Sequence, residues 1–187
     1  VSSFSQYTRE VIERYSKDLV DAGASSTLLH REWVNSRGVI FRFDRSALEI
    51  RVMDEQECIK SDVALSCFIR SVLRGLLDTN AEHSSHTVLV NDFNAIIKDG
   101  LNAKVSSPNG STARQVCQSY FNLASKYALD DEKTYLWLIK QRIEEGSLSE
   151  LIRKRVQLKA EKTNIKEAIH SVYSTLIKCL SDNEPYF

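Results

Sequence analysis

The stretch that decides the fold comprises residues 31–62 and reads REWVNSRGVIFRFDRSALEIRVMDEQECIKSD. Apolar and polar residues alternate in its middle, which is typical of β-strands because successive side chains point to opposite faces of a strand. We predict strands over residues 39–43 and 48–52, joined as an antiparallel hairpin. If Asp44 and Arg45 form a two-residue turn, position 41 lies opposite position 48, whereas a four-residue loop would pair 41 with 50.

Either register gives the hairpin the same two faces. One face is apolar and carries Val39, Phe41, Phe43, Leu48, Ile50 and Val52. The other face carries Arg42, Glu49 and Arg51. Arginine offers a planar fork of donors suited to carboxylate and phosphate, and a carboxylate beside such arginines is a natural ligand for Mg²⁺. The polar face is therefore either a site for a small anion or the solvated, ion-paired face of an edge hairpin, and both interpretations stay open.

The same residues carry a family resemblance. The run REW-NSRG, followed by RFDR-A-EIR-MD-QEC and an apolar helix that begins with Asp62, resembles the C-terminal part of the glutamate–cysteine ligase-like carboxylate–amine ligases, which are related to glutamine synthetase. Glu49, Arg51 and Asp54 match a Glu-x-Arg…Asp pattern of glutamine synthetase at identical spacing. Arg37 and Arg42 fall near earlier arginines of that pattern, with Arg37 displaced by one place.

The resemblance implies a reaction and a set of roles. ATP would phosphorylate the carboxylate of an amino acid, and an amine would displace phosphate from the acyl phosphate, as in glutathione biosynthesis. By resemblance, Glu49 holds Mg²⁺, and Arg42 and Arg51 are catalytic and contact the phosphoryl group or the substrate carboxylate. Arg37 and Arg45 complete the set of substrate- and phosphate-binding residues. The implied cofactors are ATP and Mg²⁺, and the implied partners are small-molecule substrates.

The sequence departs from such ligases in one respect. It contains no Gly-x-Glu-x-Glu strand, which supplies further metal ligands in the relatives, and it opens at Val1 in helical sequence. We therefore expect a C-terminal portion of a longer enzyme that is inactive without its N-terminal part. Weaker similarities to the family continue at residues 98–101, KDGL, and in the stretch GSLSELIRKR that begins at Gly146.

Composition narrows the function classes. Lys+Arg and Asp+Glu both total 25 in 187 residues, so the net charge is zero and no global field favours nucleic acid or an anionic membrane. No apolar run approaches the roughly 20 residues that span a bilayer. The first twenty residues are too highly charged for a secretory signal. The four cysteines form no CxxC pattern, which favours free thiols in a cytoplasmic protein. A homo-oligomer is compatible with the sequence.

Outside the hairpin the sequence predicts helices, so the expected fold class is α+β, mostly helical, with the hairpin part of a glutamine-synthetase-like antiparallel sheet. We expect a first helix over 4–20, a second that is capped by Ser61 or Asp62 and extends to about 77, and a third from 87 to Gly100. Further helices follow Ser111 or Thr112, run from Asp130 to Gly146, and fill 147–180 as one helix or two. We divide the chain into residues 1–60 and 61–187 of one catalytic domain, with the 62–77 helix packed on the apolar face of the hairpin.

Several residues outside the hairpin admit two interpretations. Arg70 and Arg74, one helical turn apart, are either surface charges or lie along the rim of a ligand cleft. Arg153, Arg155 and Lys159 are interpreted as solvated helix positions. The competing hypothesis for the whole chain is a non-catalytic helical binding or assembly module that retains the ligase fold, because a fold can outlive its chemistry.

Overall fold

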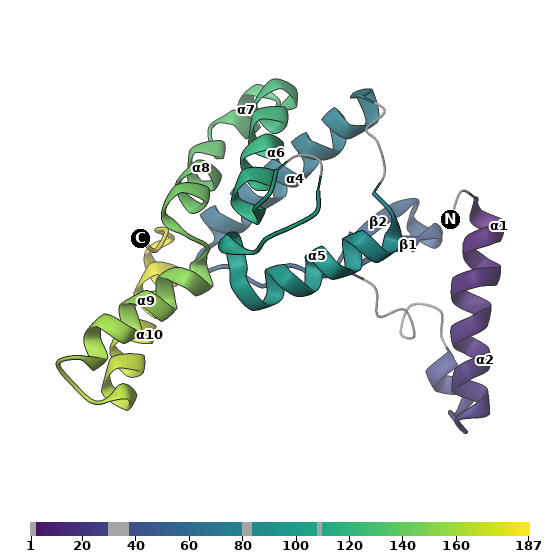
Figure 1. The fold of residues 1–187 in the computed structure, drawn as a ribbon, viewed down its shortest axis with the longest axis horizontal. Helices are drawn as coiled ribbons and strands as arrows, with labels where there is room; N and C mark the ends of the chain where they lie inside the picture. Colours follow the sequence, from purple (N-terminus) through teal and green to yellow (C-terminus); the bar gives the residue numbers. More distant parts are fainter. Residues whose placement is uncertain (1–2, 30–37, 80–83, 108–109) are drawn as a thin grey trace. The chain divides into compact units, whose positions relative to one another are not determined.

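The computed structural model describes residues 3–29, 38–79, 84–107 and 110–187 and divides the chain into two compact units, Val1–Asp54 and Glu55–Phe187 (Figure 1). Helices dominate, and the strands within the described residues form one two-stranded antiparallel sheet, so the mostly helical α+β class is confirmed. The larger sheet and the division of the catalytic domain at residue 60 stay predictions. None of the described helices is long and apolar enough to cross a membrane.

The first unit begins with one continuous helical run. Its segments are α1 (Phe4–Tyr7), the π-helix η1 (Thr8–Glu13) and α2 (Arg14–Asp21), and the short 3-10 helix η2 (Ser26–Leu29) follows. Ser3 caps the start, because its side chain accepts a hydrogen bond from the backbone N–H of Gln6 at 3.2 Å. The run ends before Gly23, whose φ of 81° stops a helix readily. The predicted 4–20 helix is thus confirmed.

The hairpin follows in the same unit and adopts the first of the two predicted registers. Strand β1 (Val39–Arg42) pairs with β2 (Ala47–Ile50), with Phe41 opposite Leu48. Strand β1 ends one residue earlier at the turn than predicted, because the 3-10 helix η3 (Phe43–Arg45) and left-handed Ser46 (φ 48°) occupy the connection. Strand β2 begins one residue earlier than predicted and ends at Ile50 instead of Val52. At the open end, Arg51 N–H donates to the carbonyl of Gly38 at 2.7 Å and extends the pairing.

Aromatic rings cover part of the apolar face of the hairpin. Phe4 meets Phe43 edge-on with ring centroids 4.2 Å apart, and Tyr7 meets Phe41 in the same way at 5.0 Å. The N-terminal helix therefore packs on this face, an arrangement that the sequence did not predict. The predicted packing of the 62–77 helix on the same face concerns two separate units and stays a prediction.

In the described part of the second unit, the regular elements are helices, with one isolated bridge between Lys104 and Thr112. Its helices are α4 (Ile59–Thr79), α5 (His86–Asp99), η4 (Gly100–Asn102), α6 (Ala113–Tyr127), α7 (Asp130–Lys133), α8 (Leu136–Glu145), α9 (Leu148–Ala160) and α10 (Ile165–Asp182). Helices α4, α6 and α8 share a core built on Ala64, Leu138, Ile139 and Ile143. Helices α9 and α10 form a hairpin around Leu151 and Val172, which Tyr186 helps to close.

Close packing between α4 and α6 depends on a glycine. A Cβ on Gly75 would lie 2.6 Å from Cγ of Leu123, so any larger residue would force the two helices apart. This tight approach holds α4 and α6 side by side (Figure 1). The contact has no signature in the sequence, since a glycine inside a helix pattern predicts only a loss of helix stability.

Two predicted helix limits differ from the structure, and at two other places the structure decides between the alternatives that the sequence left open. Helix α4 begins before Ser61, because the carbonyl of Cys58 already accepts from the N–H groups of Ser61 and Asp62, so neither residue is the cap. The predicted helix from Asp130 to Gly146 is interrupted between α7 and α8, and residues 147–180 form two helices. Of the two candidate caps for α6, the structure uses Thr112 in a capping box with Gln115.

Candidate functional site

The polar face of the hairpin brings three of the predicted site residues together. Arg42 Nη1 donates to Glu49 Oε2 at 2.5 Å, and Arg51 Nε donates to Glu49 Oε1 at 2.6 Å. Arg42 and Glu49 project from neighbouring strands, and Arg51 follows β2 two positions after Glu49, so the strand period alone places all three on one face. The Arg42 side chain is 12% exposed, whereas those of Glu49 and Arg51 are about one-third exposed.

The two arginines determine the charge state of the carboxylate. Hydrogen bonds from Arg51 and then from Arg42 hold the pKa of Glu49 below its usual range, outweighing the opposing effect of partial burial. Glu49 is therefore an anion at neutral pH, with one guanidinium against each of its oxygens. The arrangement is a preformed cluster of two positive charges and one negative charge.

The remaining predicted residues lie elsewhere. Arg45 sits in the 3-10 turn with its side chain 69% exposed, and its Nε lies 3.5 Å from Asp44 Oδ2. Asp44 also approaches Arg42, with 3.6 Å between Oδ1 and Nε, so the turn adds a second carboxylate to the edge of the cluster. Arg37 lies outside the described residues.

The donor set of the hairpin suits Mg²⁺ only as part of a larger shell. Each oxygen of Glu49 accepts one arginine hydrogen bond, and a carboxylate oxygen has a second lone pair for a cation. Within the described ranges no group of three or more His, Cys, Asp or Glu side chains could hold a metal. Mg²⁺ usually binds through one or two carboxylates, with phosphates and water completing its octahedron. Glu49 is compatible with that mode.

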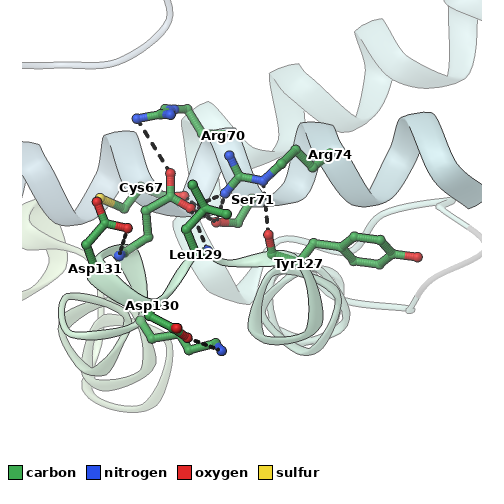
Figure 2. A network of polar contacts seen from close by, with 10 residues as sticks. Cys67, Arg70, Ser71, Arg74, Tyr127, Leu129, Asp130 and Asp131 are labelled. Carbon is green, nitrogen blue, oxygen red and sulfur yellow. Dashed lines mark hydrogen bonds and ion pairs between the residues drawn. The ribbon is translucent and has the colours of Figure 1, made fainter.

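A buried carboxylate network in the helical unit was missed by the sequence interpretation (Figure 2). Glu132, in the first turn of α7, has a side chain only 3% exposed and pairs with Arg74 of α4. It also accepts from the N–H of Leu129 at 3.0 Å and from Ser71 Oγ at 3.2 Å, and Arg70 lies 3.5 Å away. The group ties α4 to the start of α7.

Charge and hydrogen bonding compete at Glu132. Burial alone would raise the pKa of this carboxyl, but the Leu129 N–H and the Arg74 guanidinium together keep its pKa below the usual value. Arg74 Nε also donates to the carbonyl of Tyr127 at 3.0 Å. Arg70 is a largely exposed surface charge and Arg74 a half-buried one, and both are partners of a buried anion. A place for them along the rim of a ligand cleft stays a prediction. The acidic start of the helix was visible in the sequence, whereas its burial was not.

A second buried carboxylate anchors the C-terminus. Glu57, with a side chain 1% exposed, accepts through Oε1 from Arg142 Nη2 at 2.7 Å, from Ser61 Oγ at 2.9 Å and from the N–H of Tyr186 at 3.0 Å. Arg142 Nη1 donates to the carbonyl of Tyr186 at 2.8 Å, and its guanidinium lies 5.0 Å from the ring centroid of Phe187. This network joins α4, α8 and the last residues of the chain.

Comparison with known proteins identifies the family. Residues 5–175 match glutamate-cysteine ligase family 2 (GCS2), so the chain belongs to this family and is a glutamate-cysteine ligase-like protein. It is similar to an uncharacterized protein of Archaeoglobus fulgidus, with 38% identity over 186 residues that cover 100% of this chain and 45% of that protein. The chain thus spans less than half the length of that relative. No solved structure matches the chain.

Proposed function

We propose that this chain forms part of an ATP-dependent carboxylate–amine ligase, in which the polar face of the hairpin handles the phosphoryl group. The carrying observation is the cluster of Arg42 and Arg51 around Glu49, in a chain that belongs to glutamate-cysteine ligase family 2. The proposed substrates are ATP, an amino acid that offers a carboxylate, with glutamate as the family suggests, and an amine such as that of cysteine. Glutathione biosynthesis is the corresponding proposed role.

Phosphoryl transfer needs little covalent chemistry from the protein. Negative charge spreads over the equatorial oxygens of the transferred group, so catalysis consists mainly of positioning and charge stabilisation. Arg42 and Arg51 would orient the phosphoryl group or the acid carboxylate through their planar donor forks. Bound Mg²⁺ would neutralise charge on the nucleotide phosphates. Glu49, kept ionised by the two arginines, would supply one of its ligands.

The two outer arginines have supporting roles in this proposal. Arg45, largely exposed on the turn, would reach a ligand only as a solvated cation, whereas Arg42 is held firmly against Glu49. Arg37 would assist at the phosphate, as the resemblance implies. Acid and amine pockets would need residues beyond this chain, since its match covers 45% of the archaeal relative. We therefore propose that the 187-residue chain alone forms no amide and releases no ADP.

The test uses the protein encoded by the complete gene. Glu49→Gln and Arg51→Ala should each lower the rate of acid-dependent ADP release by about 10²-fold, the usual cost of removing one preorganised charge contact. Glu49→Gln should also raise the Mg²⁺ concentration needed for half-maximal rate. Arg9→Gln is the matched control, because Arg9 is a 69% exposed cation on the N-terminal helical run and its one ion pair within the described ranges is with its neighbour Glu10. Near-normal turnover in both hairpin variants, with folding intact, would refute the assignment.

The alternative of a non-catalytic binding or assembly module is favoured by one observation. Both oxygens of Glu49 are already bonded to arginines, as expected for ion pairs that simply hold the hairpin together. Under this alternative, Arg51→Ala would loosen the hairpin, and the complete protein would show no acid-dependent ADP release before or after the substitution.

A further inference from the structure

A hollow of about 330 Å³ lies in the helical unit, where the end of α5 meets the junction of α8 and α9. Its wall includes Lys98 and Gly100 from one side and Gly146, Ser149 and Arg153 from the other. These two sides come from the segments 98–101 and 146–155, which are nearly fifty residues apart in the sequence. None of the hairpin residues assigned to the ligase reaction lines it.

Backbone geometry builds the floor of the hollow. Gly100 has φ 58° and ψ −138°, a conformation that side chains rarely adopt, and a Cβ there would lie 2.9 Å from Glu150 Oε1. Glu150 is fixed in turn, because its Oε2 accepts from the N–H of Ser147 at 2.7 Å in a capping box. Gly146, at φ 131°, turns the chain from α8 into α9. The shape of the hollow thus depends on backbone held in fixed conformations as well as on side chains.

Three of the four positive side chains that line the hollow have no partner among the described residues. Lys98, Arg153 and Lys154 all line it, and in the part of the chain that the structure describes none of the three forms a hydrogen bond or ion pair. A fourth cation, Arg114, is already engaged, because its Nη1 donates to the carbonyls of Ile143 and Glu144.

Two of the three carboxylates that line the hollow accept hydrogen bonds from neutral groups, which hold them in place and leave their charge unchanged. Glu150 accepts from Ser147, and Glu145 Oε1 accepts from Gln141 Nε2 at 3.1 Å. Only Asp99 among the three lining carboxylates has no hydrogen bond or ion pair within the described residues. By formal charge, four cations line the hollow against three carboxylates, and three of the four cations have no side-chain partner within the described residues. This positive surplus favours an anionic ligand.

We propose that this hollow binds a small molecule through an oxyanion group, a phosphate or a carboxylate. Lysine and arginine are the side chains that recognise both groups, and the hydroxyl of Ser149 adds a donor at the same wall. The volume is at the small end of the roughly 300–1,000 Å³ of ligand sites, which suits a metabolite and excludes a large cofactor. The site is separate from the proposed ligase cluster, and its occupancy requires no catalysis. Arg153, interpreted from the sequence as a solvated position, becomes a ligand contact.

The test titrates the 187-residue chain, with its backbone amides assigned by NMR, with inorganic phosphate and separately with glutarate. Saturable shifts are expected at the amides of Gly100, Gly146 and Ser149. The double variant Arg153→Gln/Lys154→Gln should weaken binding by about tenfold or more, the usual effect of losing a charged hydrogen bond. The double variant Lys162→Gln/Lys166→Gln removes the same charge from residues that do not line the hollow, and should bind as the unaltered chain does.

Each outcome of the titration either supports the anion site or overturns it. Tighter binding of phosphate or of glutarate supports the site and identifies its preferred group. Equal weakening in both double variants would show general attraction to net charge and overturn the proposal, as would the absence of saturable shifts with either probe. Unchanged circular dichroism of both variants ensures that lost binding is not lost folding. Because no nucleotide or turnover is involved, failure here leaves the ligase proposal untouched, and the reverse also holds.

Discussion

Replacing Glu132 by glutamine should be among the most damaging single-atom changes in the helical unit (Figure 2). The substitution keeps the shape of the side chain and removes only its charge. Its carboxylate is 3% exposed and accepts from Leu129 N–H, Ser71 Oγ and Arg74, so the protein and not water supplies its partners. All three bonds end on Oε2, so glutamine can place its carbonyl oxygen there, but only as a neutral acceptor for the Arg74 guanidinium. Its amide N–H groups would then stand where Oε1 faces Arg70, which also only donates.

The magnitude follows from what remains unpaired. Removing one member of a fully buried ion pair costs about 3–5 kcal/mol of unfolding free energy, because the other charge is left without a partner in a dry site. Arg74 is 32% exposed and keeps its bond to the Tyr127 carbonyl, so solvent recovers part of that loss. We expect Glu132→Gln to lower the free energy of unfolding by about 2–3 kcal/mol.

The assay is urea unfolding followed by the fluorescence of Trp137 in a Trp33→Phe background, which reports on α8 alone. Asp130→Asn is the matched control, because Asp130 stands in the same turn of α7 but is 99% exposed and, among the described residues, pairs only with Lys133. It should leave the midpoint unchanged within error. An equal midpoint and m-value for Glu132→Gln and the unaltered chain would refute the reasoning, since m reports the surface exposed on unfolding.

The pH dependence of stability gives an independent test of the Glu132–Arg74 pair, because the direction of the effect follows from the lowered pKa of Glu132. The folded state holds the pKa of Glu132 below the ordinary glutamate value of 4.5, so the folded state binds fewer protons than the unfolded state in acid. The stability that the carboxylate contributes is fully present above that ordinary value and is lost as pH falls through the lowered folded pKa. The difference between Glu132→Gln and the unaltered chain should therefore be constant near neutrality and shrink in acid. A difference that grows on acidification would contradict the assignment.

Two further predictions concern the hairpin and the hollow. The carboxyl carbon of Glu49, followed by NMR, should titrate below the usual glutamate range. Arg51→Gln should raise that midpoint more than Arg42→Gln, because the Arg51 hydrogen bond is the larger cause of the lowered pKa. An unchanged midpoint in both variants would show that the ion pairs do not form in solution. Gly100→Ala should lower the thermal midpoint of the helical unit, since the strained φ and the contact with Glu150 together cost about 1–3 kcal/mol, and a midpoint equal to that of the unaltered chain would argue against this backbone conformation.

The hairpin shows how far local pattern reaches. Strict alternation predicted both strands, the shared face of Arg42, Glu49 and Arg51, and the pairing of Phe41 with Leu48 as one of two registers. Because strand side chains alternate with a period of two, only registers that keep the same residues on each face are possible. A slip of one residue would turn every side chain to the wrong face. The turn itself was less predictable, because the left-handed backbone conformation of Ser46 is imposed by the pairing of the two strands.

Most helix limits could also be predicted from the local sequence. Glycine at positions 23, 100 and 146 ended helices where the sequence indicated, and each adopts the positive φ that glycine tolerates. Thr112 capped α6 as one of two candidates. The break between α7 and α8 was missed, because no glycine or proline marks it. At this break the Thr134 hydroxyl donates to the carbonyl of Asp131, a group that would otherwise bond to the backbone of a continuing helix.

What the sequence determined by itself was therefore local: the mostly helical class, the hairpin and its charged face, and most helix ends, since periodicity and capping act over a few residues. Only the tertiary structure decided which charges are buried. Glu132 meets Arg74 across 58 positions, and Lys98 and Arg153 come to one hollow from different helices. Pairing at such separation depends on how whole helices pack, and a carboxylate that will be buried looks the same in sequence as one that will face water.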